Sequence, residues 1–276
     1  MSSSSHSTND NGQVYNALRD AIRAEVPVAL ATLIRAVDPL VVAGAKLLVR
    51  ANAEPMGTLG NVDLDRVVAR DATGELVAGL TSTRHYGPNG EARQEGVSVF
   101  IETFAPPPRM IIFGAVDFTA ALVRAGKLLG YRVTVCDARP IFATKQRFPL
   151  ADEVVNDWPD RHLSVVGSSL GPHDAVCVLT HDPKFDVPAI KSAVLTNVGY
   201  LGAMGSRKTH DTRSARLREA GLTDAEIARV MAPIGVDIGA RTPEETAISI
   251  VAEIIALRTG RVVASLRDGD GPIHRK

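Results

Sequence analysis

The pattern of apolar and polar positions changes near residue 106. Before it, the chain reads as the strands and helices of a small domain; after it, apolar runs alternate regularly with helical patterns. The first part predicts helices at 14–24 and 62–70 and strands at 26–35, 41–51, 76–83 and 97–104. Between the parts lies Pro106-Pro107-Pro108, which can neither extend a sheet nor enter a helix interior, so we place a domain boundary there.

The segment 109–137 organises the second part. An apolar run ends at Gly114, a helical pattern follows, and a second apolar run ends at Asp137. Strand, glycine turn, helix, strand and acid in this order are typical of the first βαβ unit of a dinucleotide-binding fold. The three small positions of that unit fall on Gly114, Val116 and Thr119, so a branched side chain stands where backbone would approach a pyrophosphate. The pattern predicts the fold, but not its usual ligand.

The alternation continues to the end of the second part. It predicts strands at 151–156, 174–180 and 198–204, and helices at 159–170, 187–196, 206–220, 223–231 and 243–260. In the last helix, Thr242 is the cap, Pro243 takes the first position and Glu245 completes a capping box.

The fold class is therefore α/β. We predict a Rossmann-like parallel sheet in a C-terminal domain, 109–260, and a smaller α+β N-terminal domain, 13–105. Residues 1–12 are expected to be a disordered tail, because they are too polar to fold alone, and residues 261–276 a charged tail.

Composition narrows the class of protein. Thirty-one basic and 31 acidic residues cancel, so no global field draws the chain to nucleic acid or to an anionic membrane. No apolar run approaches the length of a membrane span, and the polar N-terminus has no signal core. The two cysteines, Cys136 and Cys177, lie inside apolar runs, which predicts buried thiols in a reducing cytoplasm.

A ligand crevice in a doubly wound sheet lies beyond the carboxyl ends of its strands. Four segments should converge there: 114–118, 137–139, 180–182 and 202–209. Asp137 either accepts hydrogen bonds from ribose hydroxyls or is only a polar strand end. His181 can titrate near neutrality. A metal site is not predicted, because His181 and the adjacent Asp182 point differently from an extended chain. The further ligands that it would need, such as His173, His210 or Asp186, have no supporting spacing.

Two further segments are candidates. Gly205 to Thr209 opens a helix with two cationic side chains, Arg207 and Lys208, which suits a phosphate but equally an ordinary cap with solvated charges. Asp237 and Arg241 are four residues apart; they would form an ion pair that braces the crevice, or hold a polar ligand. No Gly-x-Ser-x-Gly elbow occurs, so we predict no catalytic nucleophile.

Four stretches in order resemble the XdhC/CoxI family: FGAVDFTAALVRAGKLLGYRVTVCDARPIFATKQRFPLADEVV, LTHDPKFDVPAI, GYLGAMGSRKTHDTRSARL and APIGVDIGARTPEETAISIVAEI. They cover about residues 109–260, and the front region resembles the N-terminal domain of that family more faintly. The candidate cofactor-binding residues on these motifs are Gly114, Ala115, Asp117, Asp137, Arg139, Thr180, His181, Asp182, Gly205, Ser206, Arg207, Lys208, Asp237 and Arg241.

The resemblance implies a cytoplasmic accessory protein that binds molybdenum cofactor (molybdopterin) while its sulfido ligand is installed. Such proteins then help insert it into xanthine dehydrogenase or carbon monoxide dehydrogenase relatives. The implied partners are an apo-molybdenum hydroxylase, a cysteine desulfurase and a second copy of the chain, as a homodimer.

Two motif positions depart from the family. Its Gly-Ala-Gly-His turn reads Gly114-Ala115-Val116-Asp117, and its Ser-Gly-Gly-Cys-x-Glu segment reads Thr58 to Asp63 without the cysteine. Two alternatives stay open: an NAD(P)-dependent oxidoreductase, against which Val116 argues, and a scaffold that acts through its protein surface.

Overall fold

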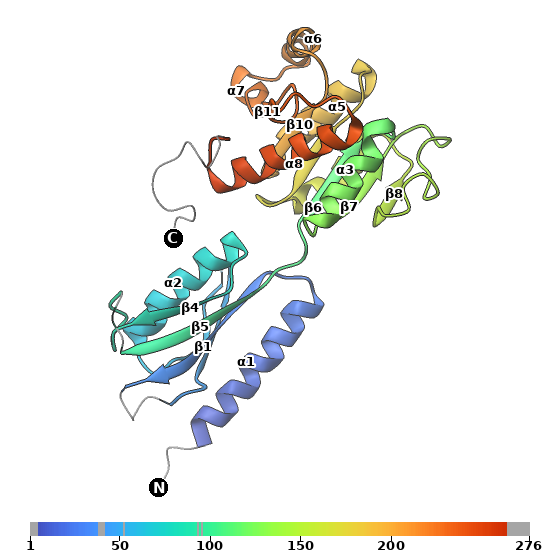
Figure 1. Ribbon diagram of the computed structural model, residues 1–276. Coiled ribbons are helices and arrows are strands. Elements are labelled where there is room, and N and C mark those ends of the chain that lie inside the picture. Colours follow the sequence, from blue (N-terminus) through green and yellow to red (C-terminus); the bar gives the residue numbers. More distant parts are fainter. Residues whose placement is uncertain (1–4, 38–41, 52, 93, 95, 264–276) are drawn as a thin grey trace. The chain divides into compact units, whose positions relative to one another are not determined.

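A computed structural model describes residues 5–37, 42–51, 53–92, 94 and 96–263, with side chains from residue 11 onward. The chain divides into two compact units, one up to Pro106 and one from Pro107 (Figure 1). In the described residues, no helix combines the length and the apolar content that crossing a membrane requires.

The first unit is a five-stranded antiparallel sheet with a helix on each face. Its strand order is β3-β2-β1-β5-β4. The elements are α1 (Ser5–Arg23), β1 (Val28–Ala36), β2 (Lys46–Arg50), β3 (Met56–Thr58), α2 (Val62–Ala78), β4 (Ser82–Tyr86) and β5 (Val97–Phe104). Alternate residues of β5, Val97, Val99 and Ile101, are buried in a core that α2 covers. Val14 and Ala21 of α1 pack in a second core with residues of β1 and β2.

The prediction differs from this unit in three places. Residues 5–12 are helical rather than a disordered tail, because they extend a helix whose later turns are anchored at Val14; residues 1–4 lie outside the described part. The strand predicted at 76–83 is wrong at its start. Leu76 continues the buried stripe of α2 at helical spacing, and the strand begins only at Ser82. The short strand β3 was not predicted.

The second unit is a six-stranded parallel sheet, which confirms the α/β Rossmann-like prediction. The strand order β11-β10-β9-β6-β7-β8 is that of a doubly wound sheet whose first strand, β6, lies next to its fourth, β9. The strands are β6 (Arg109–Phe113), β7 (Arg132–Cys136), β8 (Glu153–Val155), β9 (Ala175–Val178), β10 (Tyr200–Ala203) and β11 (Val230–Met231).

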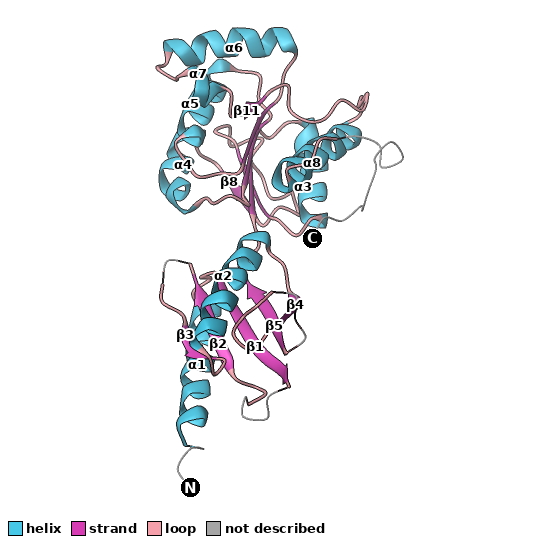
Figure 2. Cartoon of the chain, turned by 90° about the vertical axis from the view of Figure 1, so that its left-hand side faces the viewer, coloured by secondary structure: helices cyan, strands magenta, loops and turns pink. Residues whose placement is uncertain are grey.

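Helices cover both faces of this sheet (Figure 2). They are α3 (Asp117–Leu128), α4 (Pro159–Val166), α5 (Pro183–Val194), α6 (Arg207–Glu219), α7 (Asp224–Ile227) and α8 (Pro243–Thr259), with a 3₁₀ turn at Gly167–Ser169. Alternate residues of β6 face opposite ways. Ile112 packs in the core that holds α3 and α8, and Ile111 in the core that holds α4, α5 and α6. All of β9 is buried, as its uninterrupted apolar run requires.

Two details of this unit correct or confirm the prediction. The helix predicted at 223–231 is wrong in its second half, because the chain leaves α7 after Ile227 and adds β11 to the edge of the sheet. The capping box of α8 is confirmed: Thr242 accepts from the amide of Glu245, whose carboxylate accepts from the amide of Thr242. Most of the predicted charged tail, 264–276, lies outside the described residues.

Candidate functional site

The turn after β6 lies at the point where the order of the sheet reverses, between β6 and β9. Gly114 has φ +109°, a conformation that favours glycine. A Cβ added there would lie 2.7 Å from Cγ2 of Thr180, at the end of β9. The turn therefore packs directly against the next strand end. In a doubly wound sheet this is where a dinucleotide would bind.

Asp137, directly after β7, holds this turn through its carboxylate. Its Oδ2 accepts from the Ala115 amide at 2.7 Å and from Nη2 of Arg139 at 2.7 Å. Its Oδ1 accepts from the amide and from Nε of Arg139, both at 2.9 Å. Burial opposes ionisation, but these bonds outweigh it and lower the pKa of Asp137. The sequence suggested that the Asp137 carboxylate could accept hydrogen bonds from ribose hydroxyls. In the structure it accepts them from Ala115 and Arg139 instead.

The next amide of the turn is also engaged. The Val116 amide donates to Oγ1 of Thr119 at 3.2 Å, and that hydroxyl donates to the carbonyl of Gly114 at 2.5 Å. Valine has no side-chain acceptor for the first amides of α3, and the hydroxyl of Thr119 accepts instead from the amide of the N-cap residue itself. Two backbone N–H groups that would face a pyrophosphate in a dinucleotide-binding turn are hydrogen-bonded within the protein.

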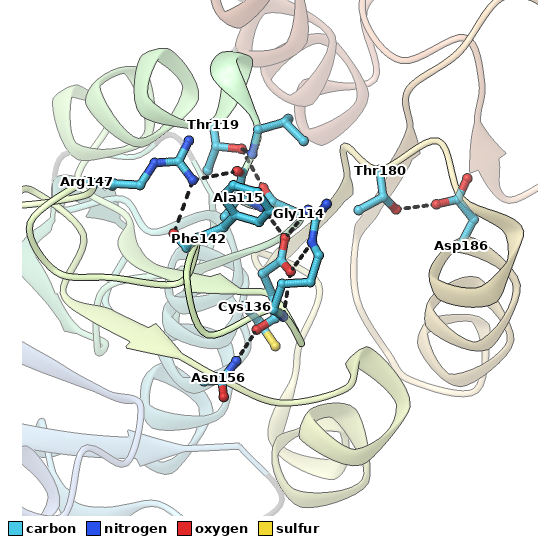
Figure 3. A network of polar contacts seen from close by, with 12 residues as sticks. Gly114, Ala115, Thr119, Cys136, Phe142, Arg147, Asn156, Thr180 and Asp186 are labelled. Atoms are coloured by element: carbon cyan, nitrogen blue, oxygen red, sulfur yellow. Dashed lines mark hydrogen bonds and ion pairs between the residues drawn. The ribbon is translucent and has the colours of Figure 1, made fainter.

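A loop after β7 folds back over the same turn. Nη1 of Arg147 donates to the carbonyl of Ala115 at 3.0 Å and to that of Phe142 at 3.3 Å (Figure 3). The guanidinium carbons of Arg139 and Arg147 lie 4.6 Å and 5.4 Å from the centre of the Phe142 ring. Cation–π contacts of this kind, added to the hydrogen bonds, fasten the loop over the turn.

A second polar cluster lies beyond β9. Thr180 donates a hydrogen bond from its hydroxyl to Oδ1 of Asp186, in the first turn of α5 (Figure 3). Oδ2 of Asp186 pairs with Nη2 of Arg213 at 2.9 Å, and that nitrogen also donates to the carbonyl of Met204 at 2.6 Å. Both charged side chains are 4% exposed. Burial raises the pKa of Asp186, and its partners only partly offset this.

Helix α6 begins at the end of β10. Ser206 caps it by accepting from the Thr209 amide at 3.1 Å, and Gly205 leaves the space that the Thr209 side chain occupies. A pocket of about 270 Å³ opens between the first turns of α5 and one side of α6. We call it the α5–α6 pocket, and it is lined by His181, Pro183, Asp186, Val187, Lys208, Thr209, Thr212, Arg213 and Arg216.

The structure sorts the predicted residues into groups. One hydrogen-bonded group joins the ends of β6 and β7: Gly114, Ala115, Asp137 and Arg139. A second lies at the α5–α6 pocket. His181 and Lys208 line the pocket, and Thr180, Ser206 and Gly205 contact residues that line it. Five others have purely local or exposed positions: Asp117, Asp182, Arg207, Asp237 and Arg241. In the described part of the chain no salt bridge joins Asp237 to Arg241, so the predicted ion pair is not formed.

Sequence reasoning missed three side chains that shape these groups, Arg147, Arg213 and Arg216, and it named Thr119 only as a small position of the turn. It considered Asp186 only as a possible metal ligand. A weak signal existed for α6, where Lys208, Thr212 and Arg216 recur every four residues on one side of the helix.

The two cysteines are not placed for chemistry in this structure. Cys136 and Cys177 are buried free thiols, as predicted. Burial raises the pKa of Cys136 to about 12, so it stays protonated at neutral pH. Within the described ranges, no three His, Cys, Asp or Glu side chains are grouped as metal ligands.

Comparisons with known proteins agree with the fold. A family model described as the XdhC Rossmann domain matches residues 110–254, and one described as the XdhC and CoxI family matches residues 21–87. The chain also matches a crystal structure of a xanthine dehydrogenase from Bacillus halodurans. The match covers 91% of this chain and 97% of that chain, with a TM-score of 0.51 and 21% identity. At that identity it supports the fold alone.

Two curated relatives carry functional names. A protein of Bacillus subtilis (strain 168), named as a probable xanthine dehydrogenase subunit, is 35% identical over 161 residues, which are 58% of this chain and 46% of the relative. The molybdenum cofactor insertion chaperone PaoD of Escherichia coli (strain K12) is 27% identical over 155 residues, 56% of this chain and 42% of the relative. The chain thus spans less than half the length of each.

Proposed function

The chain belongs to the XdhC and CoxI family, and we propose that it binds molybdenum cofactor and assists its insertion into a molybdenum hydroxylase without turning the cofactor over. The relative PaoD, named as an insertion chaperone for this cofactor, supports the proposal, as does the relative whose name places it in a xanthine dehydrogenase. Sulfuration of the cofactor while it is held would be part of the same role.

One structural observation carries the proposal. At the carboxyl edge of the sheet, the amides of Ala115 and Val116 are engaged within the protein, whereas cationic side chains gather beyond β9 and β10. A dinucleotide needs the free amides of the turn after β6, but a ligand with a single phosphate needs only the cationic side chains beyond β9 and β10. Molybdopterin carries one phosphate, so the donors present suit it. When bound, the cofactor would supply the molybdenum centre that the recipient enzyme uses.

The residues of this chain would then act as holders. Lys208 and Arg207, at the start of α6, would pair with the phosphate, and His181 would contact a polar edge of the cofactor. Neither cysteine is available to ligate molybdenum, because both thiols are buried. The partners we propose are an apo-molybdenum hydroxylase, of the xanthine dehydrogenase or carbon monoxide dehydrogenase type, a cysteine desulfurase and a second copy of the chain, in the cytoplasm.

Equilibrium binding of molybdopterin to the purified chain tests the proposal. We expect binding that weakens as salt increases, because it depends on charge pairing. We also expect weaker binding after Arg207→Ala combined with Lys208→Ala. Addition of the loaded protein to an apo-molybdenum hydroxylase should restore activity faster than free cofactor does. The proposal fails if the wild-type chain binds no molybdopterin at low salt.

A further inference from the structure

The α5–α6 pocket has an excess of positive charge. Lys208, Arg213 and Arg216 line it, and His181 lies at the end of β9. Among the described residues that line it, Asp186 is the one acid, and both of its oxygens already accept hydrogen bonds from the protein. The acid therefore neutralises part of the charge of Arg213, while Lys208 and Arg216 keep theirs.

These charges face one space because of helix geometry. Lys208, Thr212 and Arg216 are separated by four residues each, so they form one row along α6. Arg213 belongs to the neighbouring row and lines the same pocket. Opposite them, Pro183 and Val187 of α5 give an apolar wall. The pocket is thus cationic on one side and apolar on the other.

Arg213 adds an independent observation. Nη2 of this arginine donates to Asp186 and to the Met204 carbonyl, but Nη1 is buried and has no acceptor in the structure. Arg213 is 4% exposed, so its side chain is fixed in place. A buried guanidinium N–H without an acceptor is uncommon, because such groups lose their hydrogen bonds to water on folding. A ligand oxygen in the pocket that Arg213 lines would supply the missing acceptor.

We propose that the α5–α6 pocket binds the terminal phosphate of a phosphomonoester. Arg213 Nη1 donates to one phosphate oxygen, and Lys208 and Arg216 pair with the others. A phosphomonoester has three terminal oxygens and about two negative charges at neutral pH, which matches three cationic donors better than a carboxylate does. The volume of about 270 Å³ lies below the ~300–1,000 Å³ of pockets that enclose a whole small ligand, so the rest of the molecule lies outside it.

The choice of ligand rests on the proposed function. The residues that bind the phosphate differ from those named there. Arg207 does not line the pocket, whereas Arg213 and Arg216 do. Two sources share the chemistry: the phosphate of molybdopterin, and that of another phosphate ester such as a nucleoside monophosphate.

Isothermal titration calorimetry with phenyl phosphate, at low ionic strength, tests the pocket directly. Lys208→Gln combined with Arg216→Gln should lower the affinity at least about tenfold, because two charge-assisted contacts are lost. Both side chains are exposed, so the variant should fold. The matched control is Lys184→Gln combined with Lys191→Gln. It removes the same charge from exposed positions of the neighbouring helix α5 that do not line the pocket, and we expect an affinity within about twofold of the wild type.

Competition distinguishes the two sources. Phenyl phosphate and adenosine monophosphate are each titrated against bound molybdopterin in the wild type and in both variants. If phenyl phosphate binds through the pocket cations and displaces molybdopterin, the cofactor is the source. If it binds there without affecting molybdopterin, the pocket stands and another phosphate ester is its ligand. Equal affinity of the two double variants for phenyl phosphate overturns the pocket. In that case, retained binding of molybdopterin leaves the proposed function intact.

Discussion

The turn after β6 and the α5–α6 pocket lie at the same edge of one sheet, but their polar groups differ in whether the protein itself satisfies their hydrogen bonds. In the turn, Asp137 and Thr119 accept from the amides that could have faced a phosphate. In the pocket, Lys208 and Arg216 line open space, and Arg213 has a buried nitrogen without an acceptor. The comparison teaches that a shared fold does not fix where a ligand binds; the deciding feature is where the chain leaves donors free.

The largest effect should come from removing the buried cation of the pocket. Arg213→Met leaves the Asp186 carboxylate buried without its partner, which should cost about 3–5 kcal/mol of unfolding free energy. Asp186→Asn combined with Arg213→Met should recover much of this, because no buried charge remains unpaired. Urea unfolding followed by the fluorescence of Trp158 reports on this unit alone, since it is the one tryptophan of the chain. Arg216→Met, at an exposed site, is the control and should change stability by less than about 0.5 kcal/mol.

A smaller loss should follow from opening the turn at Gly114. Gly114→Ala places a Cβ 2.7 Å from the Thr180 methyl group, in a backbone conformation with φ +109°. Strain and overpacking together should cost about 2–4 kcal/mol. Thr180→Ser removes that methyl group but keeps the hydroxyl that donates to Asp186. The double variant should therefore lose less stability than the sum of the losses of the two single variants. If the losses are additive, the two strand ends do not touch.

Neutralising Asp137 should be milder and should depend on pH. Asp137→Asn replaces an acceptor by a donor facing the Ala115 amide and Arg139, at a cost of about 2 kcal/mol near pH 7. The folded pKa of Asp137 lies below its unfolded value. Its contribution is therefore complete above the unfolded value of about 4 and is lost as pH falls through the folded pKa. The stability difference between wild type and variant should shrink in that acid range; a constant difference from pH 7 to pH 3 would contradict this role.

The two regions also differ in how much of their structure could be predicted from the sequence. Apolar periodicity is a local property, so it predicts β6, β7 and β9, and it errs at Leu76, where the same residues suit a strand or one more helical turn. Position at a strand end is also local, and Asp137 lies where it was predicted. Its partners were not predicted, because saturation of a carboxylate depends on which amides the fold brings to it. The pair of Asp186 and Arg213, 27 residues apart, is visible only once α5 and α6 lie side by side.

The smallest expected change is in dinucleotide binding at the turn after β6, the region on which the sequence interpretation relied. Val116→Gly restores the glycine of a dinucleotide-binding turn, yet we expect titration with NADH or NADPH, followed by nucleotide fluorescence, to show no binding to the wild type or to this variant. The reason is that the Val116 amide is held by the Thr119 hydroxyl and the Ala115 amide by Asp137; removing a side chain frees neither. Val116→Gly with Thr119→Val releases one of the two amides and is the sharper variant. Micromolar binding by Val116→Gly alone would mean that bulk, rather than engaged amides, closes this turn to a dinucleotide.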